Sequence, residues 1–79
     1  MVNKVLAERL NKELDAIGVP EITVERVQVL AKLLKIPKYT AESLLHGIAN
    51  PDSPVLQALG KELEVNPNWL LGKSDSKSG

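Results

Sequence analysis

The chain has 79 residues, of which 43% are hydrophobic, and it contains no cysteine and a single histidine. A chain of this length folds as one domain, and without cysteine it can form neither a disulfide nor a thiolate zinc site. One histidine cannot build a zinc or catalytic cluster without carboxylates placed to help it, so we expect no metal, no cofactor and no catalytic site. Aromatic residues make up only 3% of the chain, and such an aliphatic composition favours helices. The composition therefore predicts a small all-α protein that is not an enzyme.

Charge and apolar patterning bear on where the protein works. Ten basic residues balance ten acidic ones, which argues against a non-specific coat on nucleic acid but allows one DNA-reading face. No apolar run approaches the roughly 18 residues that span a membrane. Polar and charged residues interrupt the apolar positions near the N-terminus, so no signal peptide is expected. We therefore expect a cytoplasmic protein with no membrane partner.

The first two predicted helices lie in the first half of the chain. Residues 2–17 carry apolar side chains at helical spacing, namely Leu6, Leu10, Leu14 and Ile17, and Gly18 with Pro20 ends this helix. The second helix has Thr23 as its N-cap and is interrupted at Lys35-Ile36-Pro37, because the residue before a proline leaves helical conformation. Its apolar face carries Val27, Leu30, Ala31 and Leu34.

The third and fourth predicted helices are short. The third covers residues 38–46 and ends at Gly47. The fourth begins at Ser53-Pro54, where a serine cap is followed by proline in the first turn. Its inward side chains are Leu56, Leu59 and Leu63.

The fifth predicted helix begins at Asn66-Pro67, ends at Gly72 and carries Trp69, Leu70 and Leu71. Trp69 is predicted to be a buried anchor of this helix. Residues 1–72 are thus expected to form one five-helix domain. The polar residues 73–79 are expected to form a disordered tail.

The second and third predicted helices are joined by a turn of about three residues, which is typical of a helix-turn-helix. At about 100° per residue, one side of the third helix carries Thr40, Ala41, Leu44 and Leu45. The opposite arc carries Lys38, Tyr39, Glu42, Ser43 and His46. A short helix with such an outer arc fits a major groove about 12 Å wide.

These residues resemble a known family. Leu30-Ala31, Ile36, Ala41, Leu44, Gly47, the Leu59/Leu63/Val65 stripe and Asn68-Trp69-Leu70-Leu71-Gly72 are similar to the lambdoid phage repressor and Cro type of helix-turn-helix domain. The resemblance covers about residues 4–72. It implies a compact five-helix lambda-repressor-like bundle that binds double-stranded DNA, as a dimer, in transcriptional control.

The resemblance also implies roles for single residues. Pro37, Lys38 and Tyr39 fall where the family reaches base edges, Ser43 falls at a further base position, and Arg26 falls where a phosphate is anchored. The candidate DNA-contact residues are therefore Arg26, Pro37, Lys38, Tyr39, Thr40, Glu42, Ser43 and His46. Residues 65–71 supply more apolar side chains than a short terminal helix needs for its own docking, so we expect a two-fold contact there, with Pro67 and Asn68 at its edge as the candidate dimer contacts.

Several of these candidates have an alternative interpretation. Lys38 can serve a base edge or a phosphate, and Tyr39 can contact the groove or pack on a neighbouring loop. Glu42 can accept a hydrogen bond from cytosine, repel phosphate at wrong sites, or be a plain surface residue. His46 can approach a phosphate or act as a cation near the helix C-terminus.

The chain departs from the family pattern at several positions. The stretch between Gly18 and Leu30-Ala31 is longer than usual in the family, so the second helix can begin earlier or carry an added turn. Residues 48–52 carry no positive charge, and Val27 replaces a glutamine that is common in the family. Leu14 and Leu45 occupy the positions of a frequent buried arginine–glutamate pair, so we expect an apolar contact to replace the salt bridge.

The sequence therefore predicts a sequence-specific transcriptional regulator, a repressor that binds operator DNA as a homodimer. The third helices of the two subunits would enter successive major grooves one helical turn apart. No small-molecule ligand is implied. The alternative is a protein-interaction module of the same fold, an adaptor or antitoxin-like partner with little DNA affinity. The neutral charge and the unbasic loop favour this alternative.

Overall fold

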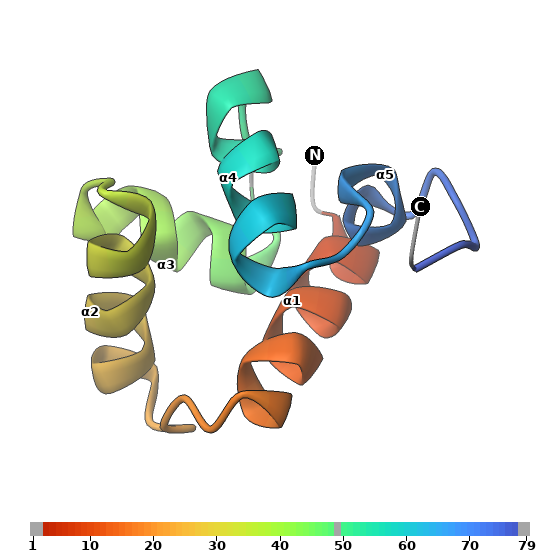
Figure 1. The fold of residues 1–79 in the computed structure, drawn as a ribbon. Coiled ribbons are helices and arrows are strands. Elements are labelled where there is room, and N and C mark those ends of the chain that lie inside the picture. Colours follow the sequence, from red (N-terminus) through yellow and green to blue (C-terminus); the bar gives the residue numbers. More distant parts are fainter. Residues whose placement is uncertain (1–2, 49, 78–79) are drawn as a thin grey trace.

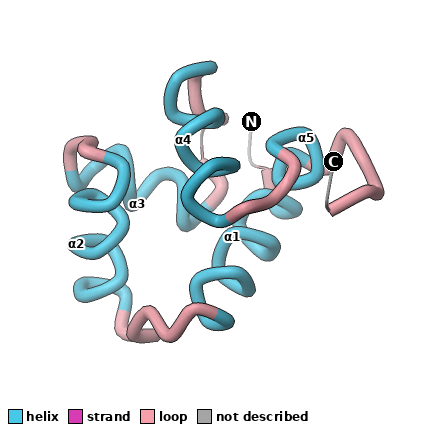
Figure 2. Tube along the Cα trace, viewed as in Figure 1, coloured by secondary structure: helices cyan, strands magenta, loops and turns pink. Residues whose placement is uncertain are grey.

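The computed structural model describes residues 3–48 and 50–77. Within these ranges the chain forms five helices and no strand (Figures 1 and 2): α1 Lys4–Ala16, α2 Thr23–Leu34, α3 Lys38–His46, α4 Ser53–Leu63 and α5 Pro67–Leu71. The globule has a radius of gyration of 11.2 Å. None of the helices in the described ranges is both long and apolar enough to cross a bilayer. The prediction of a five-helix all-α protein is confirmed.

The core is built almost entirely from leucine and alanine. Three side chains of α1 are completely buried, Leu6, Leu10 and Leu14, and each of the other four helices adds a fully buried residue. Those residues are Leu30, Ala41, Leu59 and Leu70. Burying a leucine contributes about 1.5–3 kcal/mol, so these contacts hold the bundle together without any cross-link. Helix α3 packs mainly against α2 and α1, whereas α5 packs against α1 and α4 (Figure 1).

Two helices begin one residue away from the predicted position. The N-cap of α2 is Ile22, whose side chain makes no capping bond, and Thr23 is the first helical residue. The N-cap of α4 is Asp52, whose carboxylate accepts a hydrogen bond from the Val55 N–H at 3.1 Å, so Ser53 is already helical. A carboxylate at this position caps the helix and also interacts favourably with its dipole.

Helix α3 begins and ends where the sequence predicts. Pro37 is its N-cap, and the Pro37 carbonyl accepts the N–H groups of Thr40 and Ala41. Gly47 ends it with φ 66°. A Cβ on Gly47 would lie 2.2 Å from the carbonyl oxygen of Asn3, so only glycine allows this approach. The Asn3 N–H in turn donates to the Gly47 carbonyl at 2.6 Å, which ties the start of α1 to the end of α3.

The segment predicted to be a disordered tail folds back on α1 and α5 as far as residue 77. The Lys77 ammonium lies 3.0 Å from the Glu13 carboxylate, and the Lys77 carbonyl accepts the Asn66 N–H at 2.7 Å. The Ser74 carbonyl accepts a hydrogen bond from Arg9 at 3.2 Å. These partners on α1 and at the N-cap of α5 hold a stretch whose composition alone predicted disorder. Val2, at the start of the first predicted helix, and residues 78–79 lie outside the described part.

Three apolar side chains are less buried than predicted. Trp69 is half-buried, with the Arg9 guanidinium 4.7 Å and the Lys77 ammonium 5.5 Å from its ring centroid. It packs on the core, but the fully buried anchor of α5 is its neighbour Leu70. Leu56 is also half-buried. Ile17 lies just beyond α1 and is exposed.

Candidate nucleic-acid interface

The outer side of α3 is open to solvent. Pro37, Lys38, Tyr39, Glu42 and His46 are exposed, and Tyr39 has the largest exposed fraction among the exposed large hydrophobic side chains, 75%. The opposite side of the helix is buried, at Ala41, Leu44 and Leu45. The helical phase predicted from the sequence is confirmed for these residues. A helix of nine residues at 1.5 Å per residue is about 13 Å long, which suits a single pass through a major groove.

Thr40 and Ser43 lie at the edge of this exposed side. Both are half-buried and line a hollow of about 220 Å³ between α3 and the loop before α4. The loop contributes Asn50, Pro51 and Asp52 to that hollow. Ala49 of the same loop lies outside the described residues. Thr40, which helical phase placed with the core, is therefore accessible from the loop side of α3.

Arg26 does not lie on this surface. It is 4% exposed, and its guanidinium points between α1 and the α1–α2 connection. Nε donates to the Pro20 carbonyl at 2.9 Å, and one terminal nitrogen donates to the carbonyl and the side-chain oxygen of Asn11. The other terminal nitrogen donates to Asp15 at 2.5 Å and to the Val19 carbonyl at 2.9 Å.

These bonds use all five N–H donors of the guanidinium. A phosphate would have to replace partners that are already in place, and it would have to reach a side chain that is almost wholly buried. The prediction that Arg26 anchors a phosphate is therefore corrected, and its role is structural. Its helical phase could have indicated this, because Arg26 precedes Leu30 and Leu34 by one and two turns on the buried stripe of α2.

Two grooves separate the exposed side of α3 from α2. The first has a volume of about 340 Å³, and its lining includes Val24, Val27, Gln28, Tyr39 and Glu42. The second has a volume of about 470 Å³ and is lined by Gln28, Ala31, Lys32, Ile36, Pro37 and Lys38. Gln28 and Lys32 were not among the predicted site residues. They lie one turn apart on α2, so the same helical phase that predicted α3 could have found them.

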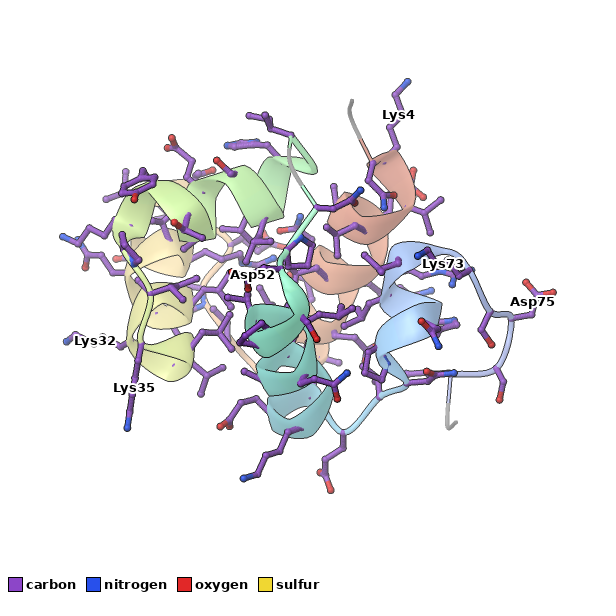
Figure 3. The ribbon with its side chains drawn as sticks, turned by 90° about the horizontal axis from the view of Figure 1, so that it is seen from above. Lys4, Lys32, Lys35, Asp52, Lys73 and Asp75 are labelled. Carbon is purple, nitrogen blue, oxygen red and sulfur yellow. The ribbon has the colours of Figure 1, made fainter. Side chains whose placement is uncertain are left out.

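Charge is distributed unevenly along α3. No acidic residue occurs between Glu25 and Glu42, whereas Lys32, Lys35 and Lys38 in that stretch are all exposed. At the other end of α3, the described loop residues have no positive charge and include Asp52. Figure 3 shows Lys32 and Lys35 on the opposite side of the molecule from Lys73 and Asp75. The basic end of the candidate interface is therefore where α2 meets α3.

The candidate dimer contacts lie on α5. Asn68 is exposed, but Pro67 is half-buried. Pro67 packs closely on Gly60 of α4, because a Cβ added to Gly60 would lie only 2.6 Å from the Cγ of Pro67. Val65 and Leu70, the apolar neighbours that suggested a two-fold contact, are buried in the core of the same chain. The apolar residues of α5 are therefore largely used in holding α5 in place.

Comparisons with protein-family models, with curated proteins and with solved structures return no match for this chain. Among the described residues, no three histidine, aspartate or glutamate side chains are grouped so as to hold a metal ion.

Proposed function

We propose that this protein binds double-stranded DNA as a transcriptional regulator, with α3 as the recognition helix of a lambda-repressor-like helix-turn-helix. The observation that carries the proposal is the exposed outer side of α3. Only residues 35–37 separate this helix from α2, and α1 and α2 pack against its buried side. A helix presented in this way can place its first residues against base edges in a major groove.

The outer side of α3 carries groups that can contact DNA. The Lys38 ammonium and the Tyr39 hydroxyl lie at the first turn, where a recognition helix reaches deepest into the groove. Ser43 can donate to or accept from several base edges, and Glu42 can accept from a cytosine amino group. His46 lies at the last turn, within reach of the sugar-phosphate backbone. Base contacts supply specificity, and phosphate contacts supply position.

Replacing Ser43 or Tyr39 with alanine should change which DNA sequences are preferred without unfolding the protein. Each good base contact discriminates by about 1–3 kcal/mol, and the buried side of α3 is untouched by these substitutions. Selection of bound fragments from a random DNA pool would first identify the preferred sequence. Titrations of each variant against that sequence and a scrambled duplex would then measure the change. Specific binding that survives alanine at every outer position of α3 would contradict the recognition-helix assignment.

The regulator is proposed to act as a homodimer, with Asn68 and the edge of Pro67 at a small two-fold contact on α5. Binding of both half-sites at once would raise the affinity for DNA without a strong contact between the proteins. Sedimentation in the presence of the selected duplex should therefore give two proteins per site and weak association without DNA. A ratio of one protein per DNA site would contradict the proposed homodimer.

A protein-interaction module is the second candidate, and one observation favours it. Ile17, Ile22 and Val24 are 59%, 64% and 67% exposed, and they lie near one another in sequence around the α1–α2 connection. Where such side chains form one contiguous patch, they mark a site of protein contact. Retention on heparin and on genomic DNA that falls with salt would favour the DNA-binding function. No retention even at low salt would favour the interaction module.

A further inference from the structure

We infer that the groove between α2 and the start of α3 holds a phosphate of the DNA backbone through Lys32, Lys38 and Gln28. The inference rests on the proposed DNA-binding function and deepens it, because it fixes the side of α3 on which one DNA strand lies. Lys32 and Gln28 are not among the DNA-contact residues predicted from the sequence. Their role follows from the groove that they share with Lys38.

The groove has the chemistry of a phosphate site that opens to solvent. Lys32 and Gln28 come from α2 and Lys38 from α3, and the apolar side chains of Ala31, Ile36 and Pro37 complete its lining. Two ammonium groups and one amide provide donors for phosphate oxygens. All three side chains are exposed, so a DNA backbone can approach them without unfolding any part of the chain.

The placement of Lys38 gains from a bound anion. Lys38 is the first residue of α3, where the partial positive charge of the helix N-terminus disfavours a cation. Lys32 adds a second positive charge to the same groove, and no carboxylate is among the groove's residues. A bound phosphate would offset the repulsion of Lys38 by the helix N-terminus and the repulsion between Lys32 and Lys38. Lys32 alone has a local explanation, since it lies in the last turn of α2 where a cation is favoured.

Other positions around α3 offer less to a phosphate. The guanidinium of Arg26 is committed to internal partners. The hollow on the loop side of α3 includes Asp52, whose carboxylate caps α4. Lys35 does not line the α2–α3 groove, and Figure 3 shows it extending in a different direction from Lys32. The α2 side of α3 is therefore where the negative charge of the DNA backbone can be neutralised.

The salt dependence of binding to a labelled random-sequence duplex tests this inference. Each phosphate contact by a cation contributes about 0.9 to the slope of log affinity against log salt concentration. Lys32→Gln and Lys38→Gln should therefore each reduce the slope by about 0.9, and the two substitutions together by about 1.8. Gln28→Ala should weaken binding without changing the slope, because a neutral amide releases no counterion.

Lys35→Gln and Lys73→Gln are the matched controls, since each removes one exposed positive charge outside the groove. Slopes that fall for the groove lysines but not for the controls would support the inference. Equal falls for all four lysines, or unchanged slopes for Lys32 and Lys38 in a protein that still binds, would overturn it and leave the proposed function standing. A parent protein that binds no duplex at low salt would instead overturn the proposed function itself, and the phosphate site with it.

Discussion

Arg26→Ala should destabilise the protein by about 3 kcal/mol, because it removes a buried group that satisfies several carbonyls at once. The carbonyl oxygens of Val19, Pro20 and Asn11 would lose their donor, and a cavity would remain between α1 and α2. For a domain of this size the melting temperature should fall by about 12–24 °C. Thermal unfolding followed by far-UV circular dichroism would measure the change.

Asp15→Asn is the matched control. Its side chain is half exposed, and an asparagine oxygen can still accept the hydrogen bond from Arg26, so the cost should be about 1 kcal/mol or less. Arg26→Lys should lie between the two, since an ammonium cannot reproduce the planar fork of the guanidinium. Equal stability of Arg26→Ala and the parent would show that Arg26 is free to turn outward, and its phosphate role would then need to be reconsidered.

Leu45→Glu should cost about 4 kcal/mol or more, since it removes a buried leucine and places a carboxylate in the core. Leu45 is 5% exposed and Leu14 is completely buried. Both lie in the hydrophobic core, where the apolar contact predicted in place of an ion pair could form. Because a small core supplies only a few kcal/mol of net stability, we expect no folded population for this variant at room temperature. Urea titration monitored by Trp69 fluorescence would test this.

Leu45→Met provides the control, because it conserves volume and polarity and should cost less than about 1.5 kcal/mol. Glu42→Ala, one turn away on the exposed side of α3, should change stability little. If Leu45→Glu melted at the temperature of the parent, Leu45 would have to be exposed, and the rotation of α3 about its axis would be different from the one described.

Elements with strong periodicity and local end signals could be predicted from the sequence. Helix α3 has its predicted bounds because Pro37 precedes it and Gly47 follows it, and α5 likewise lies between Asn66 and Gly72. The observed N-caps of α2 and α4 each lie one residue before the predicted N-cap. A hydroxyl and a neighbouring carboxylate are both good caps, so the choice between Asp52 and Ser53 depends on backbone conformation rather than on residue type.

Features that depend on contacts between distant residues could not be predicted. The tail is held by Arg9 and Glu13 of α1 and by Asn66 at the N-cap of α5. The polar composition of the tail does not indicate these partners. The candidate site was predicted in part. Helical phase identified the exposed side of α3. The resemblance placed Arg26 on a phosphate, whereas hydrogen bonds to α1 and to the α1–α2 connection hold its guanidinium inside the protein.

Asn11 connects three helices in a way that bears on how the protein opens. Its side-chain oxygen accepts a hydrogen bond from Arg26 of α2 at 3.1 Å, and its amide donates to the Leu45 carbonyl of α3 at 3.0 Å. Because one side chain links all three helices through partly buried hydrogen bonds, α1, α2 and α3 should exchange their amide hydrogens as one cooperative unit. The tail, held by partly exposed contacts, can open alone. The exposed side of α3 should therefore belong to the slowest-exchanging part of the molecule. Under the proposed function, its shape would be set before DNA binds.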